Sequence, residues 1–125
     1  MSSAQFREVI PVLPVRSVPD AVRYYTEKLG FRLHFYDAPQ NPRYAGVERE
    51  GVRLHLQWHD PVDFREAVDT LILRFVIDDV DALFAEYGNK GVFHERTAVR
   101  NTSWGTREFA FYDADGNGLT FYRNL

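Results

Sequence analysis

The chain has 125 residues, a formal net charge of −3, a pI near 5.8 and 45% hydrophobic residues, and it contains no cysteine. These values exclude an intrinsically disordered chain, and the lack of cysteine excludes disulfides, thiolate catalysis and cysteine zinc sites. No basic stripe, leader pattern or apolar run of bilayer length is found, so we expect one cytoplasmic domain that binds neither nucleic acid nor membrane.

The first half of the chain predicts a strand, a helix and three further strands. The apolar run from Val9 to Val15 contains two prolines, which predicts an edge strand or an arm. Ser17 is placed as a helix N-cap, and Gly30 ends the helix. Alternating apolar and polar residues predict the three strands: Phe31 to Asp37, Tyr44 to Glu48 and Val52 to Trp58. The polar, acidic segment from His59 to Asp69 is predicted to be a connector between halves.

The second half repeats this pattern. A strand is predicted from Leu71 to Ile77, and Asp79 caps a helix that ends near Gly88. Alternation from Thr106 to Tyr112 and again from Leu119, across a turn rich in Asp, Gly and Asn, predicts a hairpin. We therefore predict an α+β fold in which two βαβββ modules, about residues 6–60 and 70–125, make up one domain, 1–125. The modules should form a curved mixed sheet with a concave binding face.

Alternation also assigns polar side chains to the face of the sheet opposite the core. On one strand these are Arg53, His55 and Gln57, and on another Arg74 stands amid apolar residues. A lone guanidinium there is costly unless it pairs with a carboxylate such as Glu108 or faces a wet cavity. A structural ion pair and a ligand contact are equally compatible with this position.

Several segments carry a resemblance to a known family. They are Tyr24-Tyr25 with Leu29-Gly30-Phe31, Tyr44-Ala45-Gly46-Val47, Trp104-Gly105 with Arg107-Glu108-Phe109, and Asp113-Ala114-Asp115-Gly116-Asn117. The chain resembles the glyoxalase/bleomycin-resistance/dioxygenase superfamily, known as vicinal oxygen chelate proteins, and is most similar to the bleomycin-resistance proteins. The resemblance implies a small-molecule ligand and a homodimer, with an N-terminal strand that is exchanged between subunits or lies at their interface.

The resemblance also locates the superfamily's metal-ligand positions, which are Ile10, His55, Ile72 and Thr120 here. One histidine and one hydroxyl cannot replace a set of three or four ligands, so we expect no metal and no other cofactor. We expect no catalytic residues, and a binding protein is favoured over an enzyme. The alternative is a metal-independent enzyme that uses His55 or Glu108 as a general base on a small carbonyl or acid compound.

The expected ligand is a small aromatic or heteroaromatic compound that the protein sequesters, as bleomycin-type resistance proteins do. By the resemblance, Trp104 stands at the family's drug-site tryptophan, and Phe35 and Tyr44 stand at aromatic contacts, although strict alternation turns Phe35 toward the core. Inward-facing arginines favour a neutral or anionic ligand over a cation. The predicted ligand-binding residues are Phe35, Tyr44, Arg53, His55, Gln57, Arg74, Trp104, Glu108 and Thr120.

Overall fold

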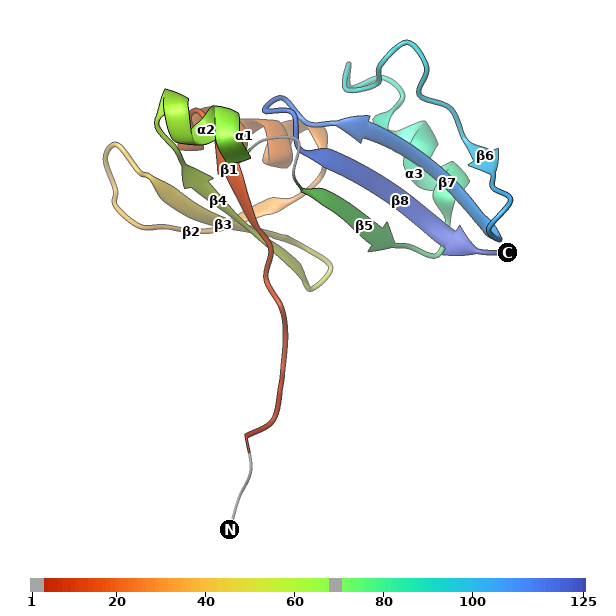
Figure 1. Cartoon of the computed structure of the whole chain (residues 1–125), viewed down its shortest axis with the longest axis horizontal. Helices are drawn as coiled ribbons and strands as arrows, with labels where there is room; N and C mark the ends of the chain where they lie inside the picture. The colour runs from red at the N-terminus through yellow and green to blue at the C-terminus, as the bar shows by residue number, and fades with distance from the viewer. Residues whose placement is uncertain (1–3, 68–70) are drawn as a thin grey trace.

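The computed structural model describes residues 4–67 and 71–125, which contain two four-stranded mixed sheets (Figure 1). The first sheet has the order β1-β4-β3-β2 and the second β5-β8-β7-β6. In each sheet the first-named pair is parallel and the others are antiparallel. The strands are β1 (Val12–Val15), β2 (Arg32–Tyr36), β3 (Tyr44–Arg49), β4 (Val52–Trp58), β5 (Ile72–Val76), β6 (Arg100–Asn101), β7 (Thr106–Tyr112) and β8 (Gly118–Asn124). The α+β class and the two modules are confirmed.

Each module carries a helix that begins at a predicted cap. Helix α1 (Val18–Arg23) follows Ser17, whose hydroxyl accepts a hydrogen bond from the Asp20 amide, and α3 (Val80–Tyr87) follows Asp79, which accepts one from Ala82. The first helix continues as a π-helical turn, η1 (Tyr24–Lys28). There the Thr26 hydroxyl donates to the Val22 carbonyl at 2.8 Å and so competes with the backbone ladder.

The prediction of a plain connector after β4 is wrong for most of the segment, because α2 spans Pro61–Ala67. The Asp60 carboxylate caps this helix by accepting the Val62 and Asp63 amides, each at 3.0 Å. Pro61 suits the first helical turn, and the buried Phe64 anchors the helix. The remaining connector positions 68–70 lie outside the described residues.

The core lies between the helices and one face of each sheet. Phe109, Phe111 and Phe121 stack with centroid distances of 5.3–6.4 Å, and Tyr87 of α3 meets Phe121 edge-on at 5.7 Å. Leu54 and Leu56 of β4 are buried on the core side of the first sheet. The opposite face of each sheet therefore carries the polar and aromatic side chains that the alternation predicts.

Residues 4–11 form an extended arm that leaves the body of the chain (Figure 1). Its apolar side chains are uncovered, since Phe6 is 100% exposed and Val9 is 87% exposed. Pairing with β4 begins only near Pro11, whose carbonyl accepts the His55 amide at 2.9 Å. Within the described residues, no helix is both long enough and apolar enough to cross a bilayer.

Candidate small-molecule binding site

The open face of the first sheet holds an aromatic cluster. His55 of β4 and Tyr44 of β3 are joined by a 2.7 Å hydrogen bond between His55 Nδ1 and the Tyr44 hydroxyl. Phe35 of β2 meets the His55 ring edge-on at 5.2 Å and is stacked 6.2 Å from Tyr44. Gln57 lies opposite Tyr44 in the strand register. Four predicted site residues are therefore brought together on this face.

Phe35 reaches this face through a β-bulge, which strict alternation could not anticipate. Leu33 pairs with Val47 and Phe35 with Gly46, so β2 advances two residues while β3 advances one. The Phe35 ring covers Gly46, where an added Cβ would lie 2.3 Å from Phe35 Cε1. The alternation-based assignment of Phe35 to the core is wrong, because the bulge places its ring beside His55 on the open face.

The electrostatics of this face favour a neutral imidazole. Burial lowers the pKa of His55, the neighbouring His34 and Arg53 lower it further, and the Glu8 carboxylate opposes the shift without reversing it. Arg53, also on this face, lies 3.8 Å from the Glu8 carboxylate on the arm, measured from Nη1 to Oε1. The first face thus presents aromatic rings and one neutral hydrogen-bonding pair, with its arginine charge partly matched.

The open face of the second sheet is built around Glu108 of β7, which is 5% exposed. Its Oε1 accepts hydrogen bonds from Thr106 Oγ1 at 2.6 Å and from Arg74 Nη2 at 3.3 Å. Burial opposes ionisation, but the bonds from Thr106 and Arg74 and the charge of Arg74 outweigh it and lower the pKa of Glu108. Arg74 also lies 4.3 Å from the Tyr122 ring centroid. The Arg74–Glu108 ion pair, one of the two alternatives left open by the sequence, is present, so the charge of this arginine is matched within the chain.

Trp104 stands at the end of this face, before β7. It is 60% exposed, as expected for a residue outside the core. Gly105 follows with a φ of 90°, a conformation that favours glycine and forms the turn into β7. The Arg100 guanidinium lies 5.6 Å from the Trp104 ring centroid. The indole therefore has Arg100 beside it, while much of its surface remains open.

A cavity of about 440 Å³ lies at the other end of the second face and includes Thr120. A loop that the sequence analysis did not single out forms part of its wall. His94 Nε2 accepts the Tyr112 amide at 3.0 Å, and Thr97 Oγ1 donates to the Ala110 carbonyl at 3.2 Å. Because these bonds depend on long-range pairing to the β7 edge, no local sequence pattern identifies them.

The predicted site residues fall into two groups, one on each sheet. Phe35, Tyr44, Arg53, His55 and Gln57 lie on the first, and Arg74, Trp104, Glu108 and Thr120 on the second. Within the described residues, 4–67 and 71–125, no hydrogen bond, ion pair or ring contact joins a site residue of the first group to one of the second. Each open face therefore carries its own separate cluster of candidate residues.

The residues at the superfamily's metal-ligand positions do not fit a metal. Ile10 and Ile72 offer no donor atom, and Nδ1 of His55 is engaged by Tyr44. Thr120 supplies one hydroxyl, which is a weak ligand without carboxylates or imidazoles beside it. Among the described residues, no three His, Asp or Glu side chains converge as a metal site requires.

Two modules that each combine four strands and a helix, with polar and aromatic residues on the open sheet faces, define a class of two-module α+β proteins. Residues 9–121 match the model of the Glyoxalase/Bleomycin resistance protein/Dioxygenase superfamily, and the chain belongs to this superfamily.

The similar proteins include bleomycin resistance proteins, a bleomycin-binding protein and a glyoxalase-related enzyme. The bleomycin resistance proteins of Geobacillus stearothermophilus and Staphylococcus aureus are 26% identical over 131 residues, covering 93% of this chain and 96% of theirs. A bleomycin-binding protein from Streptomyces verticillus, solved with copper(II)-bleomycin, has a TM-score of 0.81 and 28% identity, covering 98% of this chain and 100% of that one. A glyoxalase-related enzyme from Clostridium phytofermentans shares the fold, with a TM-score of 0.76, 21% identity and full coverage of both chains.

Proposed function

We propose that this protein binds and sequesters a small aromatic or heteroaromatic compound without a metal. The observation that carries the proposal is the pair of aromatic-polar half-sites, with Phe35, Tyr44 and His55 on one sheet and Trp104 and Glu108 on the other. Aromatic walls with a few fixed hydrogen-bonding groups are typical of small-molecule sites. The bleomycin resistance proteins and the bleomycin-binding protein support a resistance-type role.

A second copy of the chain completes the site in this proposal. Among the residues that the structure describes, no hydrogen bond, ion pair or ring contact joins the two half-sites, and β1 and β5 lie at the edges of their sheets. The exposed Phe6 and Val9 of the arm need an apolar cover, and an edge strand is the surface on which such a segment docks. The crevice would then lie between the first sheet of one protomer and the second sheet of its partner, with the arms exchanged or packed at the interface.

The charges of the half-sites favour a planar neutral ligand. Both inward arginines have acidic partners, Arg53 with Glu8 and Arg74 with Glu108. Their positive charge is thereby reduced, so ring stacking and hydrogen bonds to His55 or Glu108 carry most of the recognition.

A thermal-shift screen of planar aromatic compounds, run with EDTA and separately with added zinc, tests this function. A binder at a hundred times its dissociation constant adds about 2.7 kcal/mol to folding stability, so its melting temperature shift is easily measured. We expect some compounds to raise the melting temperature equally with chelator and with metal. Stabilisation that requires the metal, or none across a broad panel, would contradict the proposal.

The Tyr44–His55 pair supports a second candidate, a metal-independent enzyme acting on a small carbonyl or acid compound. The hydroxyl fixes one imidazole nitrogen, and the lowered pKa of His55 keeps the ring able to accept a proton at neutral pH. Glu108 is the poorer base because hydrogen bonds from Thr106 and Arg74 already occupy it and lower its pKa. Turnover of a stabilising compound that is lost in His55→Gln while binding remains would favour the enzyme.

A further inference from the structure

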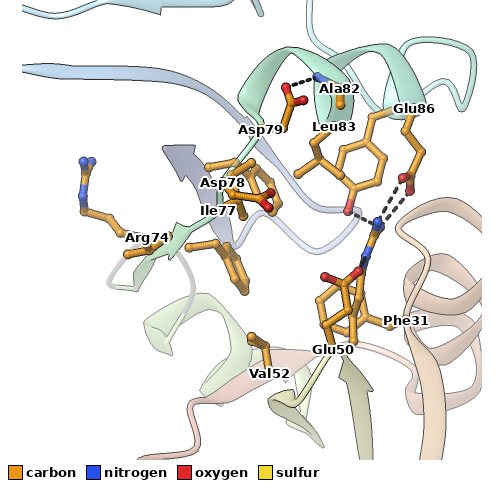
Figure 2. A pocket seen from close by; sticks show the side chains of 15 residues that line it. Phe31, Glu50, Val52, Arg74, Ile77, Asp78, Asp79, Ala82, Leu83 and Glu86 are labelled. Carbon is orange, nitrogen blue, oxygen red and sulfur yellow. Dashed lines mark hydrogen bonds and ion pairs between the residues drawn. The ribbon is translucent and has the colours of Figure 1, made fainter. Parts of the chain in front are cut away.

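A second cavity lies at the junction of the two modules (Figure 2), and Arg74 is the one predicted site residue among those that line it. Its volume is about 640 Å³, within the range of pockets that hold small organic molecules. The β3–β4 turn of the first module forms one side, and β5, α3 and the segment between them form the other. Aromatic and aliphatic side chains line its walls: Phe31, Phe75, Phe121, Tyr87, Leu83 and Ile77.

The one basic group facing this space among the described lining residues is fully engaged. Arg49 bonds both oxygens of Glu86, at 2.7 and 2.9 Å, and donates to Glu50 at 3.2 Å and to the Leu29 carbonyl at 2.8 Å. These contacts, chiefly that with Glu86, raise the pKa of Arg49. The other lining arginine, Arg74, pairs with Glu108, and Figure 2 shows its side chain directed away from the cavity.

The acidic groups outnumber this guanidinium. Glu50, Asp78, Asp79 and Glu86 all line the cavity, so four carboxylates stand against the single charge of Arg49. Asp79 is used as the α3 cap, whereas Asp78 is exposed and makes no hydrogen bond or ion pair within the described part of the chain. The cavity therefore combines aromatic walls with an uncompensated negative rim.

We propose that this cavity is a second ligand site, for small aromatic amines that carry one positive charge. The ring would lie among Phe31, Phe75 and Leu83, and the ammonium group would face Asp78 and Glu50 at the rim. Aromatic faces attract cations as well as rings, and carboxylates at the mouth raise the local concentration of cations. This cavity favours a cationic ligand, whereas the half-sites favour a neutral one. The proposal does not depend on the function proposed above.

The test uses three naphthalene probes that differ mainly in charge. Binding of 1-naphthylmethylammonium, neutral 1-naphthylmethanol and anionic 1-naphthoate is measured by isothermal titration calorimetry and by NMR shifts of Leu83 and Ile77. We expect the ammonium probe to bind several-fold tighter than the alcohol, and the naphthoate to bind weakest. Because exposed ion pairs contribute up to about 1 kcal/mol, Asp78→Asn should weaken the ammonium probe about threefold to fivefold. Glu95→Gln, which removes an exposed carboxylate away from the cavity, should leave it unchanged.

Two further variants show at which site the probe binds. Ala82→Trp fills the cavity mouth from the exposed face of α3 and should reduce affinity at least tenfold, whereas Trp104→Ala should not affect it. Loss of affinity in Trp104→Ala but not in Ala82→Trp would locate the probe at a half-site and overturn the proposal, as would equal binding of all three probes. If only Phe6→Ser exposes the cavity to the probe, the arm of a second copy is its occupant and the proposal is wrong.

Discussion

Trp104 is the residue whose position most directly suggests a contact with ligand. The Arg100 guanidinium lies 5.6 Å from its ring centroid, and Gly105 turns the chain immediately after it. A core tryptophan would be enclosed on all sides, whereas this one is largely open. Fixing an exposed ring in advance lowers the ordering cost of binding.

We expect Trp104→Ala to weaken the best compound from the thermal-shift screen by about 2 kcal/mol, or roughly thirtyfold, because a desolvated aromatic anchor is lost. The free energy of unfolding should change little, since no core cavity forms. Affinity by calorimetry and urea unfolding measure the two effects on the same variant. A loss of about 3–5 kcal/mol of stability with unchanged affinity would identify Trp104 as a packing residue instead.

At the scale of elements, the turn between β7 and β8 of the second module is held to the first module by hydrogen bonds. The Asp113 carboxylate accepts the Tyr25 hydroxyl at 2.7 Å and the amides of Asp115 and Asn117 at 2.9 Å. Asn117 Nδ2 donates to the Pro14 carbonyl of β1 at 3.1 Å. Burial raises the pKa of Asp113, so every donor to its ionised form matters for stability.

Tyr25→Phe should destabilise the protein by about 1–3 kcal/mol, because it leaves a buried carboxylate with one donor fewer. The tyrosine bond lowers the pKa of Asp113, so its removal raises that pKa further and costs most where the carboxylate is ionised. We therefore expect a larger loss at pH 7 than at pH 3, measured by urea unfolding at both values. Tyr36→Phe, at an exposed tyrosine of β2, is the matched control and should be neutral. An equal loss at both pH values would show that the hydroxyl does not act on Asp113.

Period-two alternation was sufficient to assign the faces of β4, β7 and β8, because a strand buried on one side must separate apolar from polar residues. It failed at Phe35 because a bulge depends on register with β3, which the β2 residues alone do not reveal. Helix α2 was missed because Asp60 and Pro61, a cap and a first-turn proline, were interpreted as loop residues. Glu108, the partner of Arg74, lies 34 residues away on a predicted strand, so this pair could be anticipated. Tyr25, the partner of Asp113, lies 88 residues away on a helix, and no predicted strand pairing brings the two together.

At the scale of the whole molecule, we expect a homodimer at micromolar concentration, since the arm leaves Phe6 and Val9 exposed and β1 and β5 are edge strands. Phe6→Ser with Val9→Ser should shift the sedimentation velocity profile toward monomer and weaken ligand binding together. Val62→Ser, at a similarly exposed apolar position on α2, should leave the dimer intact. A monomeric parent chain at tens of micromolar would remove the second copy from the proposed site.

The bonds from Asn117 to Pro14 and from Arg16 to Asp115 have a consequence for dividing the chain. They cross from one module to the other, so a fragment containing the first module alone would lose the acceptor of the Tyr25 hydroxyl and the donor to Pro14. Such a half would be poorly folded, and the other half would lose the Tyr25 donor to Asp113 and the Leu29 carbonyl that accepts the Tyr87 hydroxyl at 2.8 Å. Because the two surfaces complement each other, fragments cut between α2 and β5 should reassemble when mixed, as a split-protein reporter does.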